Sequence, residues 1–269
     1  MLGSSRESLA ACSAALDARR QAPGFDELSA QVFAVAALLD DNAQLRSTLA
    51  DSGQPASVRE SLIRDILANQ VSALTLEVVA DAVDHRWSDD IDLVIALEQL
   101  AAQAAFTVAE GNGTLDATEE EIFRFGRAID ASAELQMALG DPARSAQTKA
   151  AIVRDLLSDR ATAATREVLE STVGRLHGQR LDAAIDTLCE LAGRQRERVV
   201  AEVRVAAPLA EEQSRRLAAA LSSLKGRTVR LNVAVDPAVL GGVMVTIGNE
   251  VIDGTVASRL EQARRAVLG

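Results

Sequence analysis

The segment VLGGVMVTIGNEVIDGTVASRLEQARR, residues 239–265, carries four glycines, at positions 241, 242, 248 and 254. A phosphate-binding loop would need clustered glycines that lead into a helix, usually with a Lys and a hydroxyl after them. Neither G-x-x-x-x-G-K-[ST] nor G-x-G-x-x-G occurs here. Apolar residues instead alternate before Gly248 and resume after Asn249, and glycine readily takes the positive φ of a tight turn. The segment therefore predicts a β-hairpin.

At about residue 199, the spacing of apolar residues along the chain changes from a helical period to alternation. Residues 199–205 and 229–235 alternate between apolar and polar, as strands do, and residues 208–224 have the spacing of an amphipathic helix. A closing helix is expected over 256–267, after the turn residues Asp-Gly-Thr. Residues 196–269 are therefore expected to form a small α/β module.

Upstream of this module, an ungapped offset of 90 residues aligns the chain with itself. Identical pairs extend along the whole alignment, for example Asp26 with Asp116, Arg64 with Arg154, and Val83 with Val173. A single offset sustained over about ninety residues is difficult to obtain from chance matches between Ala-rich helices. The sequence therefore indicates a duplication.

Each copy has the pattern of short amphipathic helices between turns, which predicts an antiparallel helical bundle. The second copy begins inside the helix that ends the first, so the expected bundles overlap, at 1–104 and 98–195. Capping boxes are expected where Ser57 precedes Glu60 and where Thr118 precedes Glu121. The predicted fold is mainly α: two tandem bundles followed by the α/β module.

The composition of the chain and the spacing of its residues argue against several classes of function. The net charge is −11 and aromatic residues make up 2% of the chain, which disfavours binding to nucleic acid. No run of about 18 apolar residues is found, so no membrane span is expected. Cys12 and Cys189 lack the spacing of a zinc site or a disulfide framework, and two histidines, His85 and His177, are too few for a metal cluster by themselves.

No catalytic motif is found either, since neither G-x-S-x-G nor H-E-x-x-H occurs. The sequence therefore predicts no catalytic, cofactor-binding or metal-binding residue and no cofactor. The alternative that stays open is a ligand- or nucleotide-binding protein that uses the glycine-rich hairpin.

The C-terminal module carries a specific series of motifs in order: Ala207-Pro208-Leu209, Asp236-Pro237, Gly241-Gly242, Ile247-Gly248 and Val251–Thr255. In this series it resembles the delta subunit of F-type ATP synthases, whose mitochondrial counterpart is the oligomycin-sensitivity-conferring protein. The second helical copy is similar to the N-terminal bundle of the same family. Its opening helix carries Ala104-Ala105-Phe106 where the family usually has a Tyr-Ala pair, and Ala210 replaces a usual Ser.

The family usually has one bundle, and a duplicated bundle resembles its actinobacterial branch. The resemblance implies a non-catalytic stator subunit, peripheral at the cytoplasmic face of the plasma membrane. Such a subunit links the alpha subunits of the catalytic head to the b subunit of the peripheral stalk.

In the family, a groove between the first and fifth bundle helices binds an N-terminal helix of an alpha subunit. The contact residues implied in copy two are Ala104, Phe106, Val108, Val168, Leu169, Thr172 and Val173, and those in copy one are Val78 and Val83. The α/β module is implied to grip the stalk, with Asp236, Pro237, Gly241, Gly242, Gly248, Asp253 and Gly254 as its signature residues.

Overall fold

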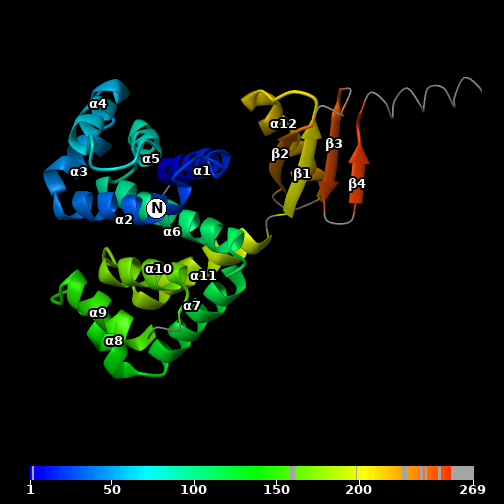
Figure 1. The fold of residues 1–269 in the computed structure, drawn as a ribbon. Coiled ribbons are helices and arrows are strands. Elements are labelled where there is room, and N and C mark those ends of the chain that lie inside the picture. The colour runs from blue at the N-terminus through cyan, green and yellow to red at the C-terminus, as the bar shows by residue number, and fades with distance from the viewer. Residues whose placement is uncertain are drawn as a thin grey trace, which may run out of the picture. The chain divides into compact units, whose positions relative to one another are not determined.

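The computed structural model describes residues 1, 3–157, 161–197, 199–225, 229–236, 239, 241–247 and 250–255. Within these residues the chain is mainly α-helical, with a small four-stranded sheet near the C-terminus, as the sequence predicted (Figure 1). It divides into two compact units, Met1–Gln195 and Arg196–Gly269.

In the described residues of the first unit, all the regular elements are helices, joined by turns and short loops. Its helices are α1 (Gly3–Ala18), α2 (Phe25–Asp41), α3 (Ala43–Ala50), α4 (Ala56–Leu67), α5 (Ala73–Asp84), α6 (Asp90–Gly111), α7 (Leu115–Asp130), α8 (Ala133–Gly140), α9 (Ala146–Leu157), α10 (Ala163–Gly174) and α11 (Leu181–Glu197). We call α1 to α6 copy one and α6 to α11 copy two. Helices α3, α4 and α5 begin at 43, 56 and 73, and α8, α9 and α10 begin at 133, 146 and 163, so the helices repeat at the offset of the sequence.

A side-chain clamp between helices also repeats. The Gln31 side-chain oxygen on α2 accepts hydrogen bonds from the Ser72 backbone N–H and the Thr75 hydroxyl, each at 2.8 Å. These two residues begin α5, so the clamp ties the start of α5 to the middle of α2. The residues 90 positions later form the same pair of hydrogen bonds: Glu121, Thr162 and Thr165. The duplication therefore preserves tertiary contacts as well as helix lengths.

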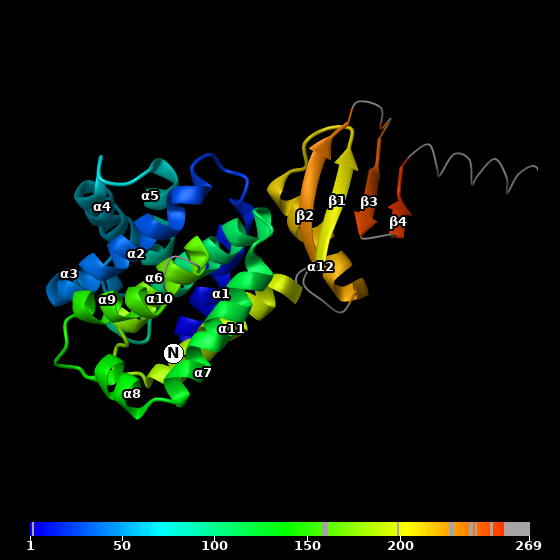
Figure 2. The ribbon, with the colours of Figure 1, turned by 60° about the horizontal axis from the view of Figure 1, so that its bottom comes forward.

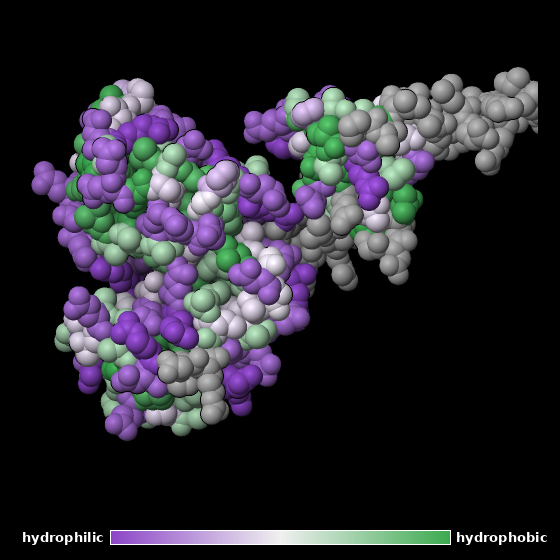
Figure 3. Space-filling view, in the orientation of Figure 1, coloured by the Kyte–Doolittle hydropathy of each residue, from purple (hydrophilic) through white to green (hydrophobic). Residues whose placement is uncertain are grey.

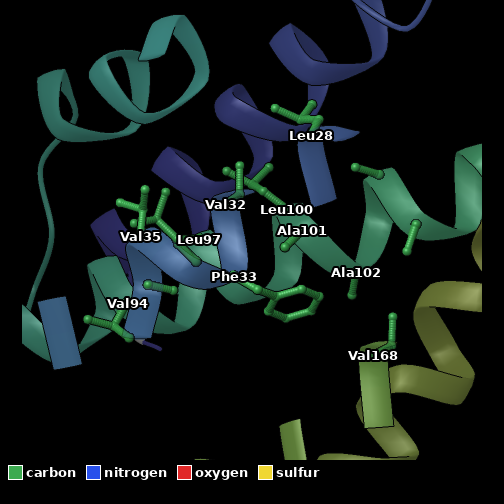
Figure 4. Packing of buried hydrophobic residues seen from close by; sticks show 14 of the residues in the cluster. Leu28, Val32, Phe33, Val35, Val94, Leu97, Leu100, Ala101, Ala102 and Val168 are labelled. Atoms are coloured by element: carbon green, nitrogen blue, oxygen red, sulfur yellow. The ribbon is translucent and has the colours of Figure 1, made fainter. Parts of the chain in front are cut away.

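Helix α6 is shared by the two copies and lies between them (Figures 1 and 2). It packs against α1, α2, α3 and α5 of copy one and against α7 and α10 of copy two. Leu97 and Leu100 face α2, while Phe33 of α2 and Val168 of α10 approach Ala102 (Figure 4). Buried alanines keep α6 narrow, which allows several helices to pack closely around it.

Helix α6 is also long and apolar enough, by length and composition alone, to cross a membrane. In the folded chain, 67% of the most apolar part of this helix is buried. Its apolar character is accounted for by packing against both copies, because a helix that is covered on all sides is apolar all round.

Both predicted capping boxes are wrong. Helix α4 begins at Ala56 with Pro55 as its N-cap, so Ser57 already lies inside the helix. Helix α7 begins at Leu115, and the Thr118 hydroxyl donates to the Thr114 carbonyl at 3.0 Å. The side chain of Glu121, which was expected to cap α7, instead forms the clamp to α10.

The second unit is an α/β module. Its elements are β1 (Val199–Val205), α12 (Glu211–Lys225), β2 (Val229–Val235), β3 (Val243–Ile247) and β4 (Glu250–Asp253). The strand order is β2-β1-β3-β4, with β1 parallel to β2 and all other pairs antiparallel. Ala201, Val203 and Val205 of β1 form a small core with Leu221 of α12. Leu224, at the end of the helical pattern over 208–224, is 66% exposed.

Strands β3 and β4 form the predicted hairpin, with Ile247 opposite Glu250. This register leaves residues 248 and 249 as the connection, and both lie outside the described residues. The closing helix expected over 256–267 also lies outside them.

Candidate partner-binding surfaces

The contact residues implied by the family resemblance lie mostly in the core of the first unit. Buried residues among them are Ala104, Phe106, Val168, Leu169 and Val173 in copy two and Val78 and Val83 in copy one. Val108 and Thr172 are partly exposed. The buried residues hold the groove helices against their own bundles, so a partner that docks on these helices must contact neighbouring positions.

The first helices of the two copies differ in what they leave exposed. Ala10, Ala11 and Ala14 are exposed on α1. Their equivalents 90 positions later on α6 are buried: Leu100, Ala101 and Ala104. Helix α2 packs along α6, where Leu100 and Ala101 lie (Figure 4), so of the two first helices only α1 presents this face to solvent. Apolar and polar side chains alternate over the surface of copy one (Figure 3).

On the α5 side of α1, the exposed surface is acidic. Glu77 and Asp84 of α5 are exposed, and Asp81 is half-buried between them. Arg19, just after the end of α1, forms an ion pair with Glu77 at 3.8 Å. The surface along α1 and α5 therefore combines alanines on one helix with carboxylates on the other.

A cluster of charged side chains joins the two copies across α6. The Arg175 guanidinium, just after α10, pairs with Asp40 at 2.8 Å and with Asp41 at 2.7 Å at the end of α2. His177 lies 2.8 Å from Glu98 of α6 and 3.4 Å from Asp40. No local sequence pattern reveals this cluster, because its members are up to 135 positions apart.

The electrostatics of the cluster favour a charged His177. Burial by itself lowers the pKa of the His177 imidazole, but the hydrogen bond and the charge of Glu98, together with Asp40, raise it above its ordinary value. Burial raises the pKa of the Glu98 carboxyl, and the contact with His177 offsets only part of that rise. The Arg175 hydrogen bond lowers the pKa of Asp41. The cluster therefore acts as an ionic contact that holds copy one against copy two.

In the α/β module, the signature glycines allow two chain segments to approach closely. Gly242 has a φ of +84°, and a Cβ at this position would meet the Gly254 carbonyl oxygen at 2.5 Å. The Gly254 N–H donates to the Val243 carbonyl at 2.9 Å. Close backbone packing therefore accounts for Gly242 and Gly254, without a role in phosphate binding. Gly241, with a φ of 141°, belongs to the same turn.

The acidic signature residues form turns. The Asp253 carboxylate accepts a hydrogen bond from the Thr255 N–H at 2.9 Å, and this bond lowers the pKa of Asp253. The Asp236 N–H donates to the Val205 carbonyl at 2.9 Å, which extends the pairing of β1 and β2. Pro237 and Gly248 lie outside the described residues.

The chain matches a known family over most of its length. Residues 97–267 match the model of the ATP synthase delta (OSCP) subunit. A delta subunit from Streptomyces griseus is 41% identical over 271 residues, with 100% of each chain covered. A delta subunit from Parafrankia sp. is 40% identical over 277 residues, with 99% of each chain covered.

A chain in a structure of the Toxoplasma gondii mitochondrial ATP synthase hexamer is 21% identical, with a TM-score of 0.28. That match covers 64% of this chain and 98% of the other. The assignment rests on the sequence relatives.

The fold and the matches define the class of protein: two tandem helical copies followed by a small α/β module. The chain belongs to the ATP synthase delta (OSCP) subunit family. It is thus a non-catalytic stator component of ATP synthase, a membrane-associated complex. The family match begins inside α6, so it covers copy two and the α/β module, while copy one precedes it.

Proposed function

We propose that this stator subunit links the catalytic head to the peripheral stalk, and that an N-terminal helix of an alpha subunit docks on α1 and α5 of copy one. The observation that carries the choice of copy is exposure. Ala14 on α1 is exposed, whereas Ala104, its equivalent on α6, is 0% exposed. A helix of the partner reaches the first of these positions without any rearrangement of the bundle.

The chemistry of this surface defines the occupant. Small side chains such as Ala11 and Ala14 allow two helices to approach closely, and an amphipathic partner helix buries its apolar side there. The exposed carboxylate of Asp84 favours a basic residue at the edge of that partner helix, since Glu77 is already paired with Arg19. The proposed complex is therefore a helix in a groove with an acidic border.

The α/β module supplies the second end of the adaptor. Its edge strands present apolar side chains to solvent, with Val235 of β2 50% exposed and Val251 of β4 59% exposed. Such residues fit the proposed contact with the stalk's b subunit, since exposed apolar residues on edge strands commonly mark interaction surfaces. The proposed location is the cytoplasmic face of the plasma membrane.

The first test measures binding of the full chain to a peptide with the N-terminal sequence of the organism's alpha subunit. Ala14→Arg should weaken binding at least tenfold, because the long charged side chain blocks close helix packing. Val58→Arg, at a site 53% exposed on α4, is the matched control and should bind as the wild type does. If Thr172→Arg in copy two abolishes binding and Ala14→Arg does not, the docking site is in copy two.

A nucleotide-binding function of the glycine-rich hairpin is the competing proposal. The packing of Gly242 against Gly254 argues against it, because the backbone there faces another segment of the chain. Saturable binding of ATP to the isolated chain, lost in a Gly241→Ala variant that stays folded, would favour nucleotide binding by the hairpin over the proposed role of the α/β module in binding the stalk.

A further inference from the structure

Three side chains that commonly bind metals meet where α1 packs against α5. Cys12 belongs to α1, Asp81 belongs to the last turns of α5, and His85 is the C-cap of α5. One ligand atom from each residue lies within 4.8 Å of those of the other two. Asp81 and His85 are four positions apart, a spacing that places two ligands on one face of a helix.

The packing of the bundle does not engage the ligand atoms of two of these residues. Among the described residues, no hydrogen bond or ion pair holds the Asp81 carboxylate or the His85 ring. The contact of His85 with Arg59 uses its backbone carbonyl, at 3.3 Å. Both side chains are half-buried, and Cys12 is 2% exposed. The three groups therefore converge at a site largely shielded from solvent.

Copy two provides an internal comparison. The positions 90 residues later hold Ala102, Ser171 and Arg175, which do not form a metal site. The Arg175 guanidinium pairs instead with carboxylates at the end of α2. Since copy two builds the same helices without these ligands, the fold itself does not require Cys, Asp and His at the three positions.

We propose that copy one binds a zinc ion through the Cys12 sulfur, an Asp81 oxygen and a His85 nitrogen, and that the ion fastens α1 to α5. A donor set of sulfur, nitrogen and oxygen suits Zn²⁺, whereas Mg²⁺ and Ca²⁺ prefer oxygen alone. Zinc bond lengths of about 2.0 to 2.3 Å place tetrahedral ligand atoms roughly 3.5 Å apart. Binding therefore requires the three ligand atoms, which lie within 4.8 Å of one another, to move closer together. A water molecule completes the coordination.

The reaction exchanges a proton for the metal. Burial, and to a smaller extent the charge of Asp81, raises the pKa of the Cys12 thiol to about 12, so the metal-free protein holds the neutral thiol. Binding forms the zinc–sulfur bond and releases the thiol proton to solvent. Arg19, a nearby cation just after the end of α1, remains paired with Glu77.

Titration of the tag-free, full-length chain with ZnCl₂ in a chelator-competition assay tests the proposal. We expect one equivalent to bind at micromolar or lower concentration and to raise the melting temperature. Cys12→Ala and His85→Ala should each weaken binding at least a hundredfold, while Cys189→Ala, at the other free cysteine, should leave it unchanged. Cobalt(II) should give the near-ultraviolet sulfur-to-metal band in the wild type and not in Cys12→Ala.

Because Cys12 is buried, its replacement can disturb the bundle. Asp81→Asn changes a half-buried side chain and keeps the shape, so it should fold normally and still weaken zinc binding at least tenfold. Absence of binding by the wild-type chain, or equal binding by all four variants, would overturn the proposal. Loss of alpha-peptide binding does not bear on this result, since the zinc titration needs no partner.

Discussion

The two copies share a backbone and differ in what surrounds their first helices. Helix α1 is packed on one side only, and Ala10, Ala11 and Ala14 remain exposed. The equivalent part of α6 closes copy one and opens copy two, so it is covered from both sides. A duplication that shares a helix therefore leaves one copy with an open first helix, while the other loses that surface to its neighbour.

The inter-copy contacts also depend on residues that the copies do not share. Arg175 occupies the position equivalent to His85, and its ion pairs with Asp40 and Asp41 hold the copies together. At the same position copy one carries a half-buried imidazole beside Cys12. After the duplication, one site thus became an ionic contact and the other a cluster of potential ligands.

The largest expected effect comes from placing the same charge on the two first helices. Ala104→Arg should destabilise the first unit by more than about 4 kcal/mol, because it forces a charged side chain into a fully buried position. Ala14→Arg, at the exposed equivalent, should change stability by less than about 0.5 kcal/mol. Urea unfolding followed by circular dichroism measures both. Equal effects would show that α1 and α6 do not differ in solution.

A second matched pair compares α2 with α7. Phe33 is 7% exposed and Phe123, its equivalent, is 60% exposed. Phe33→Ala should cost about 3 kcal/mol, because it leaves a cavity between α2 and α6. Phe123→Ala should cost under about 1 kcal/mol, since less apolar surface is returned to water. Thermal unfolding of both variants checks the ranking, and a larger loss from Phe123→Ala would contradict it.

The clamps should have effects of intermediate size. Gln31→Ala removes two neutral hydrogen bonds and should cost about 1 to 2 kcal/mol. Glu121→Ala removes the equivalent pair and should cost about 2 to 3 kcal/mol, because a charged acceptor makes stronger hydrogen bonds. Chemical denaturation of the full chain provides the values. A cost below 0.5 kcal/mol in both variants, on the order expected for surface changes, would mean that the clamps contribute nothing.

The smallest effect concerns pH at the contact between copies. The folded pKa of His177 lies above the unfolded value of about 6.5, so the stability that it contributes is complete below that pH. This contribution is lost as the pH rises through the folded pKa. The difference in unfolding free energy between the wild type and His177→Gln should therefore shrink as the pH rises from about 6 to about 9, a range that spans the titration of an imidazole.

Removal of the partner carboxylate sharpens this measurement. In a Glu98→Gln background, the pH dependence that is due to His177 should be much weaker, because the main hydrogen bond that favours the charged ring is gone. An advantage of the wild type that grows with rising pH would contradict the assigned direction.

Much of the local structure could be predicted because it depends on short sequence patterns. Periodicity placed the bundle helices, alternation placed β1 and β2, and the glycine pattern placed the β3–β4 pair. The capping boxes failed for the opposite reason. A Ser or Thr three residues before a Glu is also common inside a helix, and only packing decides where the helix begins.

By itself, the sequence determined the duplication, the helical class, the α/β module and the family, since all of these are recorded in residue order and spacing. The tertiary structure decided which side chains are exposed, because burial depends on helices that are distant in the chain. It buried Val168 and Phe106, which the family resemblance had implied as contacts. It also brought Cys12 to His85, and Arg175 to Asp40, across 73 and 135 positions of sequence, distances over which no local pattern carries information.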